Sequence, residues 1–326
     1  MNRPDMMWSM LVHLGLNISN ERGNTNCYPS EGPRTGALPY LNFCRETWDS
    51  YLLQMKAAGI NTIVLELAEG LRYESHPELA VEGSWTREEM EAELVRLRAM
   101  GFEVVPKLNF SASHDEWLGE YSRMVSTPTY YKVCADIIHE VCDIFKPKYF
   151  HLGMDEETPV HQELFYMAII RQYDLWWHDL LYLVDLVDKE NVRAWVWSDK
   201  IWHHREAFLK KMPKSVLQSN WYYYSSCDKD YLLSTNRGDK YNVVNYLECF
   251  DVLEANGYDQ VPTGSNFYVA ENMDILVRHC ADRIAPERLL GFMQSTWKST
   301  TPVHVDRLTQ ATDILKKSKD WFDSRG

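Results

Sequence analysis

The stretch KYFHLGMDEETP, residues 148–159, places a short apolar segment directly before three adjacent acids, Asp155, Glu156 and Glu157. Its first half has the length and apolar character of a strand that is buried on both faces. Three neighbouring carboxylates repel one another, so they are either solvated in an acidic loop or held together for a purpose. Which interpretation is favoured depends on how many similar strands the chain contains.

Seven further segments are β-rich, and helix-period segments separate them. The eight candidate strands are 9–16, 61–68, 102–109, 148–154, 192–199, 215–223, 259–265 and 289–297. Strands buried on both sides and alternating with helices are typical of a (β/α)8 TIM barrel. The rival is a doubly wound open sheet, which normally has a glycine-rich phosphate turn after an early strand, and LVHLGLNISN (11–20) is not such a turn. With no linker or low-complexity tract, we expect a single domain over residues 1–326.

Several helices carry their own boundary signals. Thr86 and Glu89 match a capping box, and Thr127-Pro128 places proline in the first turn of a helix. We expect a long helix from Glu163 to Glu190, apolar all round, and a closing helix over 305–322. Residues 17–40 are expected to form a long polar loop on the catalytic side of the barrel.

The net charge and the amino-acid composition limit the classes of molecule that the protein can bind. The net charge is −13, and the sequence has no basic stripe, which argues against nucleic acid and against an anionic membrane surface. Twelve Trp and nineteen Tyr suit flat, partly apolar ligands such as sugar rings, or else a Trp-rich core. The composition does not indicate whether the protein is a monomer or an oligomer.

Cysteine spacing and the N-terminus bear on the compartment. The seven Cys have no CxxC pairing or framework spacing, which indicates reduced core thiols, with Cys134 and Cys142 on one buried helix face. MNRPDMMWSMLVHLGL (1–16) lacks a cleavage site, and no segment has the length of a membrane span. We expect a cytoplasmic protein, with an exported form whose signal was already removed as the open alternative.

In a barrel, Asp155 and Glu156 follow the fourth strand and lie at its catalytic mouth. One carboxyl of such a pair can donate a proton to a leaving oxygen while its ionised neighbour steadies developing positive charge. Glu157 is then a spare residue, solvated or structural. The other strand ends also carry polar or aromatic groups: Glu66, Glu69, Asn109, His114, Trp195, Trp197, Asp199, Asn220, Trp221, Gln294 and Trp297. An acidic pair walled by Trp predicts a sugar pocket, although each Trp alone could be core.

The segment HLGMDE (151–156) is similar to the His-x-Gly-Gly-Asp-Glu signature of family-20 glycoside hydrolases, the β-N-acetylhexosaminidases. The resemblance covers most of the chain in order. The segments 59–79, 86–114, 196–200 and 289–297 resemble the family's second strand, third strand and later Trp-bearing strands. The chain therefore looks like a divergent member of that family's catalytic barrel.

The resemblance implies a retaining, substrate-assisted mechanism in which the 2-acetamido oxygen of a β-linked N-acetylhexosamine attacks the anomeric carbon. It implies that Asp155 orients the acetamido group and that Glu156 is the general acid/base, with no metal and no cofactor. The substrate-binding residues that it implies are Trp197, Trp221 and Trp297 as pocket walls, Tyr268 on the acetamido oxygen, His114 beside Glu156, and Asn109 and Glu69.

Four positions depart from the family pattern. Met154 replaces the second Gly of the signature, and Asn109 stands where Asp is usual. Gly15 stands where the first strand should end in Arg, and Ser299 stands where an acid should follow the last Trp. Because such groups hold the outer hydroxyls of the sugar, the identity of the sugar and exo or endo action stay open.

Two other functions remain as alternatives. One is a carbohydrate-binding or catalytically degenerate barrel, which the departures favour. The other is a metal-dependent barrel hydrolase or isomerase, whose ligands would come from His13, Glu66, His151, Asp155 and Asp199.

Overall fold

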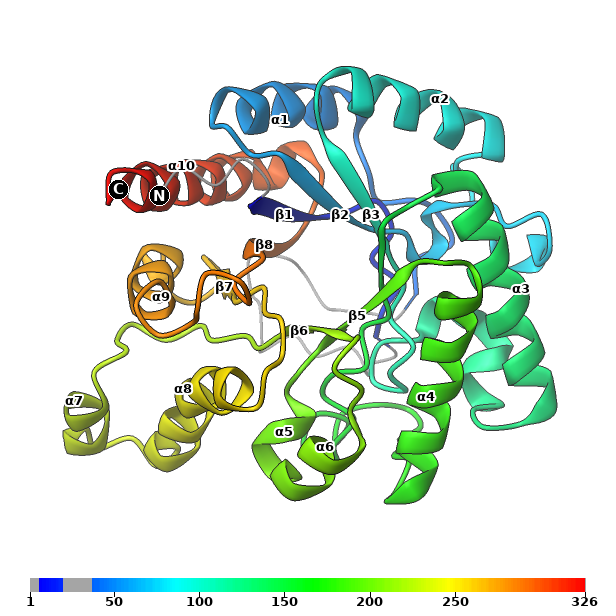
Figure 1. Cartoon of the computed structure of the whole chain (residues 1–326). Helices are drawn as coiled ribbons and strands as arrows, with labels where there is room; N and C mark the ends of the chain where they lie inside the picture. Colours follow the sequence, from blue (N-terminus) through cyan, green and yellow to red (C-terminus); the bar gives the residue numbers. More distant parts are fainter. Residues whose placement is uncertain (1–5, 20–36, 326) are drawn as a thin grey trace.

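The computed structural model describes residues 6–19 and 37–325. Eight parallel strands form its centre, with the outer helices arranged around them (Figure 1). The strands are β1 (Met7–His13), β2 (Thr62–Glu66), β3 (Glu103–Lys107), β4 (Tyr149–His151), β5 (Arg193–Trp197), β6 (Leu217–Ser219), β7 (Thr263–Ser265) and β8 (Gly291–Ser299). All eight overlap the predicted segments, with β1 and β8 extending two residues beyond them, so the TIM barrel prediction is confirmed.

The sheet order is β6-β5-β4-β3-β2-β1-β8-β7, and every strand pair is parallel. Two parallel bridges, Gln218 with Gln260 and Trp221 with Thr263, join the β6 and β7 edges and nearly close the ring. The carboxyl ends of all the strands therefore meet at one mouth.

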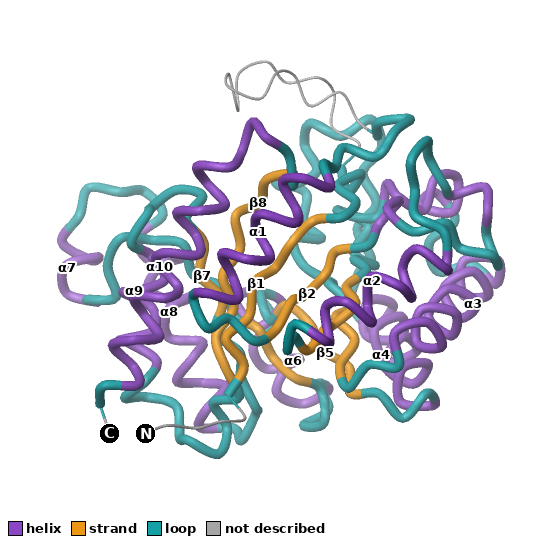
Figure 2. The backbone as a smooth tube through the Cα atoms, turned by 90° about the horizontal axis from the view of Figure 1, so that it is seen from above, coloured by secondary structure: helices purple, strands orange, loops and turns teal. Residues whose placement is uncertain are grey.

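The helices form the outer layer that surrounds the strands in Figure 2. They are α1 (Arg45–Ala57), α2 (Arg87–Ala99), α3 (Pro128–Phe145), α4 (Asp174–Lys189), α5 (Lys200–His203), α6 (Arg205–Lys211), α7 (Lys229–Ser234), α8 (Lys240–Ala255), α9 (Asn272–Cys280) and α10 (Val305–Asp323). Short 3-10 helices are η1 (Ala68–Gly70), η2 (Pro77–Leu79), η3 (Glu116–Arg123) and η4 (Pro302–His304). The Thr86–Glu89 capping box and the proline in the first turn of α3 are both present, as predicted, and Thr127 caps α3 as well.

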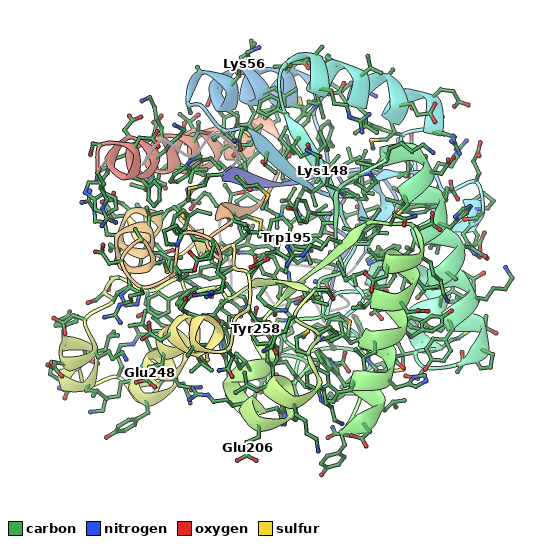
Figure 3. All side chains as sticks on the ribbon, in the orientation of Figure 1. Lys56, Lys148, Trp195, Glu206, Glu248 and Tyr258 are labelled. Atoms are coloured by element: carbon green, nitrogen blue, oxygen red, sulfur yellow. The ribbon has the colours of Figure 1, made fainter. Side chains whose placement is uncertain are left out.

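The apolar core has two parts, one between strands and helices and one inside the barrel. Trp195 lies in the middle of the barrel, whereas Lys56, Glu206 and Glu248 point outward at the periphery (Figure 3). The Trp195 indole donates to Ser219 Oγ at 2.7 Å, so this Trp is a core residue.

The thiols match their prediction in part. Cys134, Cys142, Cys249 and Cys280 are buried free cysteines, the first two on α3, while Cys44 and Cys227 are half-buried. Cys27 and residues 20–36 of the predicted polar loop lie outside the described residues. Within the ranges 6–19 and 37–325, no helix is long and apolar enough to cross a membrane.

The predicted helix from Glu163 to Glu190 is wrong over residues 163–173, because α4 begins at Asp174. Residues before it form turns that are tied to the barrel mouth. The Gln162 amide pairs with the backbone of Ile169, and the Arg171 guanidinium is buried against Glu157. These tertiary contacts outweigh the helical pattern of the segment.

Candidate active site

The backbone after β4 leaves the regular strand conformation. Gly153, Met154 and Glu156 have φ values of 70°, 75° and 53°, in the left-handed region. A Cβ at Gly153 would lie 2.1 Å from Asn109 Oδ1, so only glycine fits there. Met154 adopts a conformation that favours glycine, which explains why its position is glycine in the family signature that the segment resembles. The turn replaces the alternation of a strand, so that neighbouring acids can share one pocket.

Side chains from the two neighbouring strand ends hold this strained segment. Ser111 and Ser113, after β3, donate to the backbone carbonyls of Asp155 and Glu156. The backbone N–H of Glu156 donates to Asp199 Oδ2, after β5, at 3.0 Å. The acidic pair is therefore fixed from both sides by groups that the barrel itself positions.

Asp155 is buried and hydrogen-bonded. Its Oδ1 accepts from Asn109 Nδ2 at 2.7 Å, and its Oδ2 lies 3.6 Å from His114 Nε2. Asn109 therefore contacts Asp155 directly, which places it next to the acetamido position that the family resemblance predicts.

Glu156 lies between two imidazoles. Its Oε2 is 3.3 Å from His114 Nε2 and 3.1 Å from His161 Nδ1. Burial raises the pKa of Glu156, but the hydrogen bond from His114 and the charge of His161 outweigh it, so the net pKa lies below the ordinary value. Burial lowers the pKa of His114, and the nearby Asp155 and Glu156 carboxylates raise it more, so its net pKa is raised. A proton can thus be exchanged between His114 and Glu156.

Asp199 is a third carboxyl beside this pair. Its pKa rises from 3.8 to about 8, first because of burial and then because of the negative charge of Asp155. The group is therefore held neutral near pH 7, which removes one negative charge from the crowded mouth.

The third acid of the opening stretch, Glu157, points into the protein. It is buried, and its carboxylate receives the Arg171 side chain at 2.6 Å and the backbone N–H of Ala112 at 3.1 Å. Arg171 also bonds Asp179 Oδ2 at 3.1 Å. Of the two roles expected for Glu157, the structural one is confirmed and the solvated one is wrong.

A cavity of about 570 Å³ opens above the acids. Its lining includes Asp155, Glu156, Asn109, His114, Glu69, Trp197, Trp221, Trp297 and Tyr268, so the structure brings together every predicted site residue. Trp297 has φ 53° and lies where the β1–β8 register shifts, an irregularity that re-aims a side chain. Its ring lies 5.9 Å from that of Trp197, which forms a continuous aromatic wall.

Tyr223 shares the cavity with the acids and was not among the predicted site residues. Its ring stacks on Trp221 at 5.0 Å, and its hydroxyl oxygen accepts from Trp297 Nε1 at 3.2 Å, which leaves the hydroxyl proton for a ligand. Burial raises the pKa of Tyr223 well above its ordinary value. The predicted acetamido partner, Tyr268, is 71% exposed at the rim of the cavity. Both tyrosines line the cavity, and the Tyr223 hydroxyl lies deeper in the aromatic wall.

The end of β1 differs from the pattern that the family resemblance predicts. A Cβ at Gly15 would lie 2.3 Å from the Leu67 carbonyl oxygen, so no larger residue fits there. Both oxygens of Glu69 accept backbone N–H groups, from Leu16 and Asn17, each at 2.9 Å. Glu69 lines the cavity, but these bonds give its carboxylate a structural task.

An ion pair lies under the floor of the cavity. Lys107 and Glu66 are both buried, and the Lys107 ammonium donates to the Glu66 carboxylate. The ammonium lies 5.9 Å from the centroid of the Trp197 ring. Lys107 also lines the cavity, so a positive charge faces the acids from below.

The metal ligand set considered from the sequence does not form a cluster. His151 is an inner-barrel residue whose Nδ1 accepts from the Gly153 N–H, and its ring packs on Trp197 at 4.5 Å. Among the described residues, the one group of three His, Cys, Asp or Glu side chains close enough to share an ion is His114, Glu156 and His161. His161 comes from the turns before α4, where the sequence carries no signal for it.

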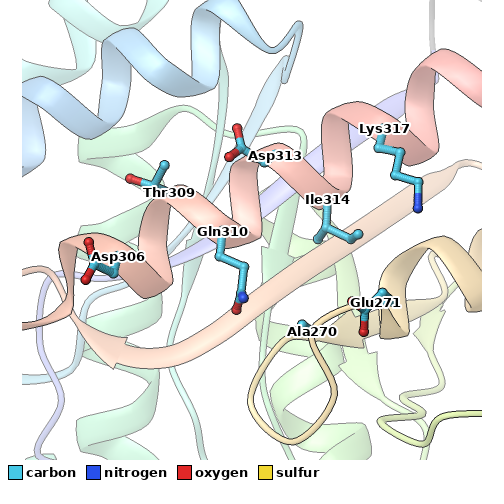
Figure 4. A pocket seen from close by; sticks show the side chains of 8 residues that line it. All are labelled: Ala270, Glu271, Asp306, Thr309, Gln310, Asp313, Ile314 and Lys317. Atoms are coloured by element: carbon cyan, nitrogen blue, oxygen red, sulfur yellow. The ribbon is translucent and has the colours of Figure 1, made fainter.

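A second hollow of about 390 Å³ lies in the outer layer, between α10 and the turn before α9 (Figure 4). Its lining is mostly polar and charged side chains of α10, such as Asp306, Gln310 and Asp313. It contains no constellation with a chemical role, so the barrel mouth is the candidate site.

Comparison with solved structures bears on the fold. A family-20 exo β-N-acetylglucosaminidase from Vibrio harveyi, in complex with N-acetylglucosamine, has a TM-score of 0.61 at 12% identity, over 98% of this chain and 56% of that one. The β-N-acetylhexosaminidase from Bacteroides fragilis has a TM-score of 0.59 at 14% identity, over 98% and 71%. The one from Streptomyces coelicolor has a TM-score of 0.60 at 12% identity, over 95% and 64%.

The chain shares the barrel fold of these family-20 hexosaminidases. It spans about half the length of the first solved structures that it matches. No protein-family model matches the sequence, and no curated protein matches it. The similarity is therefore one of fold, and the chemistry has to be argued from the residues of this chain.

Proposed function

We propose that this protein is a retaining β-N-acetylhexosaminidase that cleaves a β-linked N-acetylhexosamine with the help of the sugar's own acetamido group. The observation that carries the proposal is the pair Asp155 and Glu156, fixed side by side in a Trp-walled cavity at the mouth of the barrel. The fold that it shares with hexosaminidases supports the same reaction class.

The two acids have different tasks. Glu156, 33% exposed to the cavity, protonates the glycosidic oxygen as the bond to the anomeric carbon breaks. The acetamido oxygen attacks the anomeric carbon from the other face and closes an oxazolinium ring. Asp155, held by Asn109, accepts the acetamido N–H and stabilises the positive charge on that ring. Glu156 then takes a proton from the water that opens the ring, so the configuration is retained.

The aromatic residues provide the shape of the pocket. Trp197, Trp221 and Trp297 surround a flat, partly apolar ring, and the Tyr223 hydroxyl can donate to the acetamido oxygen. His114 shares a hydrogen bond with Glu156 and orients its carboxyl, while Glu156 regains from the water the proton that it gave to the leaving oxygen.

Hydrolysis of 4-methylumbelliferyl β-N-acetylglucosaminide and of its galacto epimer tests the proposal, with Glu156→Gln as the matched variant. The expected result is turnover by the wild type and a loss of about 10²–10⁴-fold in kcat in the variant, with unchanged thermal unfolding. Full activity of Glu156→Gln would contradict the role of Glu156. Binding of sugars without turnover by the wild type would favour the carbohydrate-binding alternative instead.

A further inference from the structure

The group His114, Glu156 and His161 has the composition and spacing of a metal site. Two imidazole nitrogens and one carboxylate oxygen are a ligand set that zinc takes in hydrolases with an open fourth position. In this chain one ligand atom from each of the three residues lies within 4.8 Å of the other two.

The two distances from Glu156 fit a tetrahedral ion. Zinc bonds nitrogen and oxygen at about 2.0–2.2 Å, so two ligands of a tetrahedral ion lie about 3.3 Å apart. Glu156 Oε2 lies 3.3 Å from His114 Nε2 and 3.1 Å from His161 Nδ1. The two imidazole rings meet at 68° with centroids 5.0 Å apart, so they approach the carboxylate from different directions.

The three side chains are also held in place. His114 is buried in the loop after β3, and Glu156 is fixed through its backbone by Ser113 and Asp199. The loop with His161 is tied down, since the next residue, Gln162, donates to Ser113 Oγ at 2.9 Å.

The site faces the cavity. The side chains of Glu156 and His161 are 33% and 27% exposed, and all three residues line the hollow above the acids. An ion held by three protein ligands would therefore have an open position for water or for an oxygen of a ligand.

We propose that His114, Glu156 and His161 form a binding site for one divalent transition-metal ion, zinc in the first place, at the mouth of the barrel. The same Oε2 atom cannot hold the ion and carry the catalytic proton. Zinc is thus a reversible inhibitor of the glycosidase, a consequence that rests on the proposed function, whereas the binding site itself does not.

Calorimetric titration of zinc chloride into the full chain, pretreated with chelator, tests the site. The expected result is one ion per chain for the wild type and affinity at least tenfold weaker for His161→Ala, with His161→Asn as a second variant if the first does not fold. The same variant should lose the visible absorption of tetrahedral cobalt when cobalt chloride replaces zinc.

Two controls separate this site from other histidines. His304→Ala removes an imidazole from the cavity rim, and the double variant His203→Ala/His204→Ala removes an exposed pair after β5. Both should bind zinc as the wild type does. The proposal is overturned if the wild type binds no zinc, if His161→Ala binds it equally well, or if only the His203/His204 variant loses binding.

The two proposals can fail separately. Zinc binding that depends on His161 in a protein without hexosaminidase activity would support the metal site and contradict the proposed function. Hexosaminidase activity in a protein that binds no zinc would support the proposed function and contradict the metal site.

Discussion

The mouth of the barrel has two sides that solve different problems. Around β4, three residues adopt left-handed backbone and the acids Asp155 and Glu156 lie together over a cavity. Around β1 and β2, the carboxylate of Glu69 accepts hydrogen bonds from two backbone amides, and the neighbouring backbone leaves no room for a side chain at position 15, which is glycine. The left-handed backbone and the adjacent carboxylates on the β4 side both destabilise the fold, and packing gives no reason for them. Such features cluster at functional sites, so we expect the function on the β4 side.

The difference also separates chemistry from recognition. The β4 side keeps the acidic pair that the proposed reaction needs. The β1 and β8 side has Gly15 and Ser299 where the family resemblance predicts groups that hold the outer hydroxyls. The proposed function therefore rests on the β4 side, whereas the β1 and β8 side departs from the family pattern.

The largest effect on stability is expected for Arg171, whose buried ion pairs hold the segment after β4. Arg171→Met should lower the free energy of unfolding by about 3–5 kcal/mol, because it leaves Glu157 and Asp179 buried without their cation. The matched control, Arg237→Met, removes an exposed pair with Asp239 and should cost about 0–1 kcal/mol. Urea denaturation measures both, and equal values would mean that the buried network does not anchor the loop.

Variants on the two sides of the mouth should change different kinetic parameters. Asp155→Asn should lower kcat for a β-N-acetylglucosaminide about 10²–10³-fold, since it removes the charge that steadies the oxazolinium ring. Ser299→Ala, on the other side of the cavity, should act mainly on KM. If Ser299→Ala lowers kcat as much as Asp155→Asn does, the division between chemistry and recognition is wrong.

Glu69 tests whether the β1 side is built for stability. Glu69→Gln should destabilise the fold by about 1–3 kcal/mol, because one of its two acceptor oxygens becomes an amide that faces a backbone N–H. Thermal and urea unfolding measure this change. A variant as stable as the wild type but with a raised KM would instead assign Glu69 to the substrate.

The last expected effect concerns Asp199 and depends on pH. The pKa of Asp199 is raised from 3.8 to about 8 in the folded state, so the folded protein holds a proton that the unfolded chain releases in this range. Wild-type stability should therefore fall as pH rises from 3.8 to about 8, by at most about 1.4 kcal/mol per pH unit. Asn does not titrate, so Asp199→Asn does not lose stability in this way as pH rises. The stability of the variant relative to the wild type should therefore increase with pH. A constant difference between pH 5 and pH 8 would show that Asp199 ionises normally.

The sequence predicts the strands and the acidic pair because both depend on local pattern. Buried parallel strands are continuous apolar runs, and residues at or just after their carboxyl ends must lie at the mouth, as Trp197, Trp297 and Asp155 do. Their positions follow from topology alone, without knowledge of any loop.

Residues on loops could not be predicted in the same way. His161 reaches Glu156 because the buried Arg171 pairs with Glu157 and holds the turns between them against the barrel. The helical pattern had instead placed Arg171 inside a helix that starts at Glu163. Tyr223 faces the acids because it stacks on Trp221 beyond the end of β6. These placements depend on tertiary contacts, so the sequence did not single out His161, and the family resemblance implied Tyr268, which lies at the rim of the same cavity.

The central claim is that Asp155 serves the acetamido group during catalysis. A thiazoline analogue of the bicyclic oxazolinium intermediate tests it most directly, since enzymes bind such analogues more tightly than substrates. Calorimetry in the presence of a chelator should show that the wild type binds the analogue and that Asp155→Ala binds it at least 100-fold more weakly, while both bind N-acetylglucosamine weakly. Equal affinity of the two proteins for the analogue, or no binding by the wild type, would contradict the account.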